Sequence, residues 1–132
     1  MAEPRAPRRG ELFWVDWSPA RGSEAGGRRP ALIVQRDAGN LAKSYPNTVV
    51  VAVSSQGHEI PLHVRVRPTR ENGLSNVSFV KCEQVFTIAK ERLGSRLGRL
   101  RSDEMLKVNE ALRLNLDLEG SSKPEVRSKP VH

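Results

Sequence analysis

Short runs of β-type residues, repeated along a chain of 132 residues, limit the folds open to this sequence more than any other feature. Branched and aromatic residues dominate these runs, and such side chains favour strands because they pack well on a pleated sheet. The expected strands cover residues 12–17, 31–35, 48–54, 63–67, 77–80 and 85–88. Strands this short and closely spaced predict a mainly β domain, either a small barrel or a sandwich.

One helix is expected near the C-terminus. Ser102 is a suitable N-cap, and Asp103 and Glu104 follow it in the first turn, where the helix dipole stabilises negative charge. Apolar residues then recur at helical spacing, namely Met105, Leu106, Val108, Leu112, Leu114 and Leu116. This apolar stripe predicts a helix that packs against the strands.

The length of the chain suits one domain, expected at residues 10–118, with flexible ends at 1–9 and 119–132. No apolar run approaches the ~20 residues of a membrane-spanning helix, and the N-terminus lacks the apolar stretch of a secretory signal. Cys82 is the only cysteine, which excludes an intramolecular disulfide and a cysteine-based zinc cluster. These features predict a cytoplasmic protein that does not enter a membrane.

The net charge of +7 suggests an anionic partner. The two ends of the chain account for much of it, because residues 1–10 and residues 121–132 each carry a net charge of +2. The body between them keeps only +3. Composition therefore favours a nucleic-acid partner only mildly.

Residues 18–28 carry three glycines and no large apolar side chain, and a long loop in a small domain is more often functional than idle. Glycines let backbone N–H groups approach a phosphate, and Ser23 adds a hydroxyl donor. Arg29 follows at the start of the next strand, and Pro30 restricts its backbone to extended conformations. The planar guanidinium of Arg29 presents several N–H donors, which suits a phosphate undergoing substitution. Composition alone, however, favours an ordinary surface arginine.

Ser54 ends the valine-rich strand and is followed closely by Gln56 and Gly57. A hydroxyl that leaves a buried strand beside an amide can donate to a phosphate or to a base edge. A plain strand end that leads into a turn is the alternative, and this segment alone favours it.

Together these segments resemble the MazF/PemK/Kid family of toxins. The matching residues in the first half are 9–11, 14–16, 18–19, 22–24 and 29–34. In the second half they are 52–56, 61–64, 83–88, 92–93 and the helix at 105–118. Because order, spacing and strand context agree over roughly residues 8–118, the resemblance is highly specific.

The resemblance implies a small SH3-like barrel with a C-terminal helix, of the MazF/PemK/CcdB type, assembled as a homodimer whose interface grooves bind RNA. It implies a toxin of a type II toxin–antitoxin system that cuts single-stranded RNA within a short sequence. Cleavage would need no metal or other cofactor, and would leave a 2′,3′-cyclic phosphate and a 5′-hydroxyl. The implied protein partner is a cognate antitoxin with an acidic, disordered tail.

The family's catalytic pair is the arginine of the Arg-Pro strand start and a hydroxyl residue at the strand-end motif, which correspond to Arg29 and Ser54. Most members carry threonine at the second position, so the serine keeps the hydroxyl but loses the methyl that fixes its rotamer. Glu24 is a candidate to orient Arg29 or to accept a proton, because arginine side chains stay protonated far above neutral pH and are poor bases. The residues expected to contact RNA are Ser23, Arg28, Gln56 and Gln84.

Two other functions suit the same fold. A non-catalytic toxin such as the CcdB gyrase poison would have a protein target, but Arg29 and the 54–56 motif argue against it. An RNA-binding module that lost catalysis through Ser54 would bind RNA without cutting it. His58 and His63 would lie on opposite faces of a continuous strand, which disfavours a catalytic histidine pair.

Three further residues are expected to be structural. Cys82 is expected to be buried in a strand, and Trp14 and Trp17 are expected in the core or at an interface, although one of them could instead stack on a base.

Overall fold

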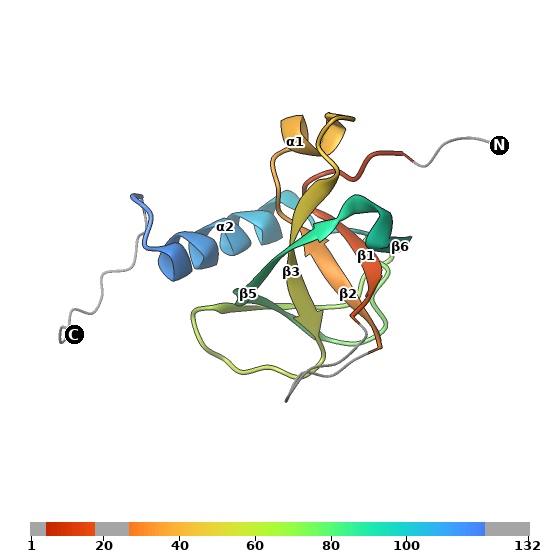
Figure 1. Cartoon of the computed structure of the whole chain (residues 1–132). Helices are drawn as coiled ribbons and strands as arrows, with labels where there is room; N and C mark the ends of the chain where they lie inside the picture. Colours follow the sequence, from red (N-terminus) through yellow and green to blue (C-terminus); the bar gives the residue numbers. More distant parts are fainter. Residues whose placement is uncertain (1–4, 18–26, 121–132) are drawn as a thin grey trace.

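One curved antiparallel sheet forms the centre of the structure, a computed structural model that describes residues 5–17 and 27–120 (Figure 1). Its strands are β1 (Glu11–Asp16), β2 (Arg28–Ile33), β3 (Asn47–Ser54), β4 (His63–Val66), β5 (Ser78–Ala89) and β6 (Leu93–Arg99). They lie in the order β4-β5-β3-β2-β1-β6, so β4 and β6 are the edges of a sheet that is not closed. The expected mainly β fold with a C-terminal helix is confirmed.

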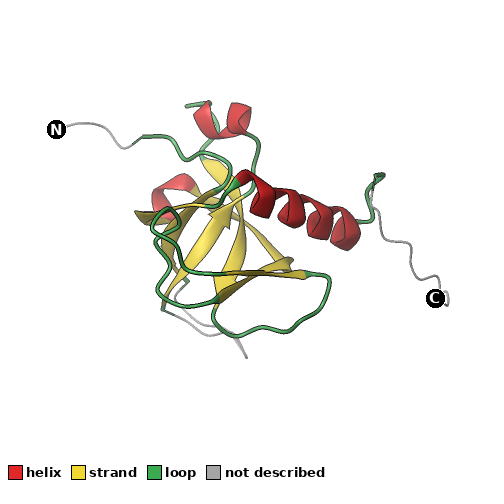
Figure 2. Ribbon diagram, turned by 180° about the vertical axis from the view of Figure 1, so that it is seen from behind, coloured by secondary structure: helices red, strands yellow, loops and turns green. Residues whose placement is uncertain are grey.

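Two short helices and one long helix complete the described part of the chain. They are α1 (Asp37–Leu41), the 3-10 helix η1 (Lys90–Arg92) and α2 (Ser102–Leu116). Figure 2 shows α2 running beside the sheet, close to the end of the chain. None of the helices in residues 5–17 and 27–120 is long and apolar enough to cross a membrane.

Strand β5 corrects the expectation of two separate strands at 77–80 and 85–88. It runs without a break from Ser78 to Ala89, but its register against β3 shifts, because Val51 pairs with Val85 whereas Ala52 pairs with Lys81. Residues 82–84 therefore have no partner on β3, which is the signature of a bulge. The polar residues that suggested an interruption are part of this bulge.

Several other boundaries differ from the sequence prediction. Arg28 belongs to β2 and not to the preceding loop, and the helix α1 and the strand β6 were not predicted. In α2, Arg101 takes the N-cap position and Ser102 is already helical, so the proposed serine cap is wrong by one residue. The Glu104 carboxylate accepts the backbone N–H of Arg101 at 2.9 Å, which satisfies one donor at the start of the helix.

Alternation along the strands buries apolar side chains on both faces of the sheet. One face packs against α2 and forms a cluster that includes Leu12, Leu32, Val51, Val53, Val80, Cys82, Val108 and Ala111. The other face forms a second cluster of Val15, Ala31, Ile33, Val50 and Ile88. Because apolar side chains pack on both faces of the sheet, contacts on both sides hold β2 and β3 in place.

The crossover between β4 and β5 is turn-rich, as expected, and is organised by the buried Asn72. The Asn72 Oδ1 atom accepts the backbone N–H groups of Thr69 at 3.0 Å and Leu74 at 2.9 Å. The adjacent Gly73 has a φ of 69°, a left-handed conformation, and a Cβ there would lie 2.2 Å from the carbonyl oxygen of Leu97. Only glycine suits this position.

Candidate active site at the paired ends of β2 and β3

Antiparallel pairing of β2 with β3 places the two predicted catalytic residues at the same end of the sheet. The β2–β3 ladder ends with Ala31 opposite Ala52, and Arg29 and Ser54 each lie two residues beyond that last pair, at the same end of the two strands. The two segments that the sequence singled out separately therefore meet at one end of the sheet.

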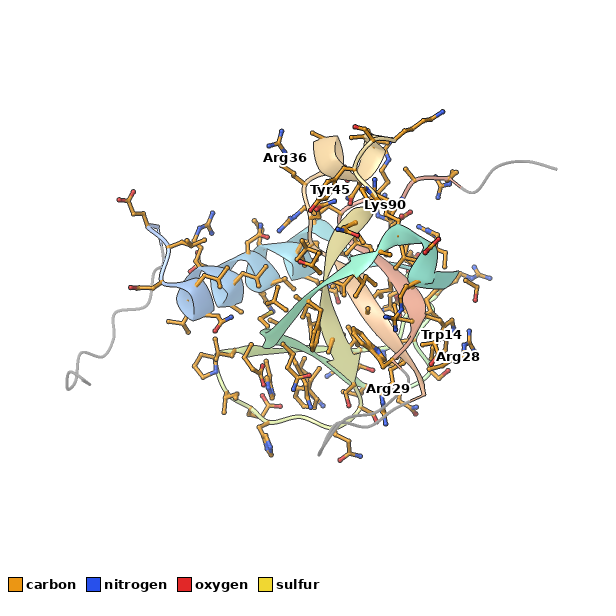
Figure 3. All side chains as sticks on the ribbon, viewed as in Figure 1. Trp14, Arg28, Arg29, Arg36, Tyr45 and Lys90 are labelled. Carbon is orange, nitrogen blue, oxygen red and sulfur yellow. The ribbon has the colours of Figure 1, made fainter. Side chains whose placement is uncertain are left out.

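Arg29 is the second residue of β2, is half-buried, and pairs with Val15 of β1. Figure 3 places it at the end of the sheet where β2 begins, near Arg28. Its Nε atom is buried and has no hydrogen-bond partner in the described part of the chain. Because a buried unsatisfied donor costs roughly 1–3 kcal/mol, this guanidinium favours the arrival of an acceptor such as a phosphoryl oxygen.

Ser54 is the last residue of β3, is half-buried, and pairs with Phe79 of β5. Its Oγ atom accepts the backbone N–H of Gln56 at 3.0 Å. A hydroxyl that accepts one hydrogen bond still has its own proton to donate. The Ser54 hydroxyl is therefore held from one side and is able to donate from the other.

The segment after Ser54 folds back over the ring of Phe79. A Cβ added to Gly57 would lie 2.3 Å from the Phe79 Cγ atom, so the backbone of Gly57 rests directly on this ring. One residue later, the backbone N–H of His58 donates to Nδ1 of His63 at 3.0 Å. This turn corrects the expectation that His58 and His63 lie on opposite faces of a strand. Their rings stack with centroids 6.0 Å apart.

His63 has both ring nitrogens engaged. Since Nδ1 accepts the His58 N–H, the proton of the neutral ring is assigned to Nε2, which donates to the Glu83 carboxylate at 2.9 Å. Burial acts to raise the pKa of Glu83, but the hydrogen bond from His63 and the nearby charge of Lys81 act the other way, and the pKa of Glu83 lies below 4.5, its ordinary value. With both nitrogens bound to protein groups, His63 is not free to exchange a proton with a substrate.

The predicted RNA-contacting residues occupy different environments. Arg28 is exposed, and its guanidinium carbon lies 4.8 Å from the ring centroid of the half-buried Trp14, a cation–π contact (Figure 3). As a neighbour of Arg29 on the same strand, Arg28 points to the opposite face. Gln56 is exposed after β3, and Gln84 is half-buried in the β5 bulge. Ser23 and Glu24 lie outside the described residues.

The remaining candidates have structural positions. Trp17 packs against Phe86 with ring centroids 5.0 Å apart and contributes to the second apolar cluster, as expected of a core tryptophan. Cys82 is buried in β5, and burial, with a smaller effect of the Glu83 charge, raises the pKa of its thiol to about 12. The expectation of a buried strand cysteine is confirmed.

The comparison with known families agrees with this geometry. Residues 8–116 match the family described as the PemK-like, MazF-like toxin of type II toxin–antitoxin systems. The chain belongs to this family. The MazF-like chain is 38% identical over 113 residues to Endoribonuclease EndoA of Bacillus subtilis (strain 168), an alignment that covers 84% of this chain and 95% of the relative.

Solved structures of MazF-like proteins have the same fold. An endoribonuclease in complex with its cognate antitoxin, from a mycobacterial species, is 29% identical and has a TM-score of 0.71, covering 86% of this chain and 97% of the other. MazF of Deinococcus radiodurans is 26% identical with a TM-score of 0.70, covering 87% and 100%. The MazF-like fold implied by the sequence motifs is therefore confirmed.

Sequence reasoning missed the pairing of His63 with Glu83. Each residue was part of a recognised motif, but their contact depends on β4–β5 pairing and on the β5 bulge. The alternation of Val64 and Val66 revealed the strand β4. It carried no information about which part of β5 would lie beside His63.

Proposed function

We propose that this chain is the toxin of a type II toxin–antitoxin system and cleaves single-stranded RNA in the cytoplasm, inhibiting translation and growth. Family membership and the similarity to Endoribonuclease EndoA support this proposal. The observation that carries it is that Arg29 and Ser54 lie at the same end of the neighbouring strands β2 and β3, where the buried Arg29 Nε has no partner among the described residues and the Ser54 hydroxyl has a proton to donate.

The proposed reaction is a transphosphorylation within the RNA. The 2′-hydroxyl oxygen attacks the adjacent phosphorus and loses its proton, and the bond from phosphorus to the 5′-oxygen breaks as that oxygen takes up a proton. The products are a 2′,3′-cyclic phosphate and a 5′-hydroxyl. Arg29 neutralises the charge that develops on the phosphoryl oxygens, and Ser54 donates a hydrogen bond to one of them. Glu24 is proposed to orient Arg29 or to accept the 2′ proton.

The same proposal assigns the partners. Ser23, Arg28, Gln56 and Gln84 bind the RNA, and two copies of the chain form the functional homodimer. A cognate antitoxin with an acidic tail occludes the positive groove. The net charge of +7 suits both ligands, and a mycobacterial relative has been solved in complex with its cognate antitoxin.

The test is cleavage of a long single-stranded RNA by the purified protein in excess EDTA. We expect discrete fragments with 5′-hydroxyl ends, and a loss of at least about a hundredfold in kcat for Arg29→Ala, as for removal of an oxyanion-stabilising donor. Arg36→Ala is the matched control, because this exposed arginine lies at the opposite end of the molecule (Figure 3). It should cleave like the unmodified chain.

Four results would overturn the proposal or parts of it. An Arg29→Ala protein that cuts as fast as the unmodified chain would remove Arg29 from the site. Cleavage that stops in EDTA would contradict the metal-independent mechanism. RNA that binds but stays intact would favour an RNA-binding module, and inhibition of DNA gyrase without RNA cleavage would favour the toxin with a protein target.

A further inference from the structure

We propose that His63 is a positioning residue for Ser54, which it holds in place through the backbone of residues 56–58, and that Glu83 fixes the protonation pattern of its ring. This inference rests on the proposed function, because it assigns a role in the RNA cleavage by Arg29 and Ser54. It concerns residues that do not touch the reacting atoms.

The first step links the Ser54 hydroxyl to the loop that follows it. Oγ of Ser54 accepts the N–H of Gln56 at 3.0 Å. A hydroxyl rotates freely unless its partners restrict it, and this contact, by occupying one lone pair of Oγ, restricts the directions in which the Ser54 proton can point. The position of the Gln56 amide therefore matters for any hydrogen bond that Ser54 donates.

The second step concerns what holds the loop. The backbone of Gly57 rests on the ring of Phe79, and the N–H of His58 donates to Nδ1 of His63 at 3.0 Å. Gln56 and His58 are exposed, and Gly57 is half-buried. The His58 N–H to His63 bond ties this part of the loop to β4, in addition to the bond from the Gln56 N–H to Ser54 at the end of β3. Without the bond to His63, this segment still has the Gln56–Ser54 hydrogen bond and the contact of Gly57 with the Phe79 ring, but His58 loses its anchor to β4.

The third step explains the role of Glu83. A neutral imidazole carries its proton on one nitrogen only, so Nδ1 can accept from His58 only if the proton is on Nε2. The Glu83 carboxylate accepts that Nε2–H at 2.9 Å and so favours this tautomer. Lys81 lies opposite His63 in the β4–β5 ladder and adds a positive charge beside Glu83. The carboxylate is thereby kept ionised and able to accept.

The ring itself is rigidly placed. The His63 side chain is only 3% exposed, and its ring centroid lies 6.2 Å from that of Phe79, the residue paired with Ser54. A buried ring that contacts two strands and a loop has little freedom to move. His63 therefore fixes the loop relative to the sheet, and the loop in turn orients the Ser54 hydroxyl.

The test compares His63→Asn, which keeps an acceptor near the Nδ1 position, with His63→Gln, which reaches toward Glu83 but lacks that acceptor. We expect His63→Gln to lose about tenfold in kcat, the effect of one hydrogen bond, with little change in KM. His63→Asn should recover most of this loss. Asp103→Asn, at an exposed ion pair at the start of α2, is the control and should leave kcat unchanged.

A double-mutant cycle separates positioning from general damage to the fold. In a Ser54→Ala background, His63→Gln should cause no further loss of kcat, because the hydroxyl that it positions is already gone. A further loss of about tenfold, equal to that in the unmodified chain, would overturn the inference. So would a His63→Asn protein as slow as His63→Gln.

A spectroscopic measurement decides the inference independently of cleavage. The ¹⁵N NMR signals of His63 should show a protonated Nε2 and an unprotonated Nδ1. Glu83→Gln keeps an acceptor oxygen and should preserve this pattern, whereas Glu83→Ala should shift the proton toward Nδ1 and move the amide signals of Gln56 and His58. If the unmodified chain cuts no RNA, the proposed function fails, and these signals still show whether His63 orders the loop. A proton on Nδ1 in the unmodified chain would overturn the inference.

Discussion

Ser54 is not β-branched, so its own covalent structure restricts its χ1 angle less than would the threonine that the family resemblance implies at this position. The hydroxyl relies on the Gln56 N–H for its direction, whereas a β-branched threonine has a restricted χ1 angle of its own. The strand end is also a position where β-branched residues pack well. The orientation of the Ser54 hydroxyl therefore depends both on its own χ1 angle and on the Gln56 N–H that it accepts.

We expect Ser54→Thr to cleave RNA at least as fast as the unmodified chain, with a gain in kcat of up to about threefold, because its added methyl limits the rotamers. Ser54→Ala should lose about tenfold or more, since it removes the donated hydrogen bond. Steady-state cleavage of one short RNA, with KM measured in parallel, checks both. A Ser54→Ala protein of unchanged kcat would exclude a role for this hydroxyl.

The positions of Arg29 and Ser54 at strand ends could be predicted from the sequence because their signals are local, whereas their catalytic roles come from the family resemblance and stay a prediction. An arginine before a proline at a strand start and a hydroxyl at the end of a valine-rich strand can both be read without knowledge of the fold. The contact of His63 with Glu83 could not be predicted, because it joins two strands whose register is set by an unforeseen bulge.

Among the elements, β1, β2 and β3 were predictable because branched and aromatic residues are concentrated in them, and β4 and α2 because apolar residues recur in them with the period of a strand or a helix. β6 was not, because Leu93–Arg99 contains two glycines, a serine and two arginines and is mostly exposed. It forms a strand because it pairs with β1, a contact between segments that are far apart in the sequence. Its pairing is irregular, with two register shifts.

The crossover between β4 and β5 offers a stability test at this scale. Gly73→Ala should lower the free energy of unfolding by about 1–3 kcal/mol, because the residue has a left-handed φ and its Cβ would meet the Leu97 carbonyl. Urea unfolding followed by tryptophan fluorescence measures this. Ser75→Ala, at an exposed position of the same crossover, is the control. Equal midpoints for the two variants would contradict the expectation.

For the whole molecule, two carboxylates join segments that are distant in sequence. The pKa of Asp37 is lowered chiefly by the N–H of Arg9, against the opposing effect of burial, and Glu83 is held by His63. A carboxylate with a lowered pKa in the folded state stabilises the fold above its ordinary pKa, and this contribution is lost as the pH falls through the lowered value. Acid should therefore weaken the contact of Asp37 with Arg9 and that of Glu83 with His63.

We expect the free energy of unfolding to fall as the pH drops below about 4.5 and 3.8, the ordinary pKa values of these two groups. The double variant Asp37→Asn, Glu83→Gln should be less stable than the unmodified chain at pH 7 and should lose less stability on acidification. Chemical unfolding at a series of pH values measures both slopes. Parallel curves for the two proteins would assign the acid sensitivity to other groups.

The bulge in β5 limits how this molecule can vary over evolution. Cys82 and Val85 both face the α2 side of the sheet, although their odd separation would place them on opposite faces of a regular strand. Removal of one residue here would exchange the faces of Val85, Phe86 and all that follow in the strand. Descendants of this chain are thus free to change the site by substitution, while insertions and deletions at residues 82–84 are selected against.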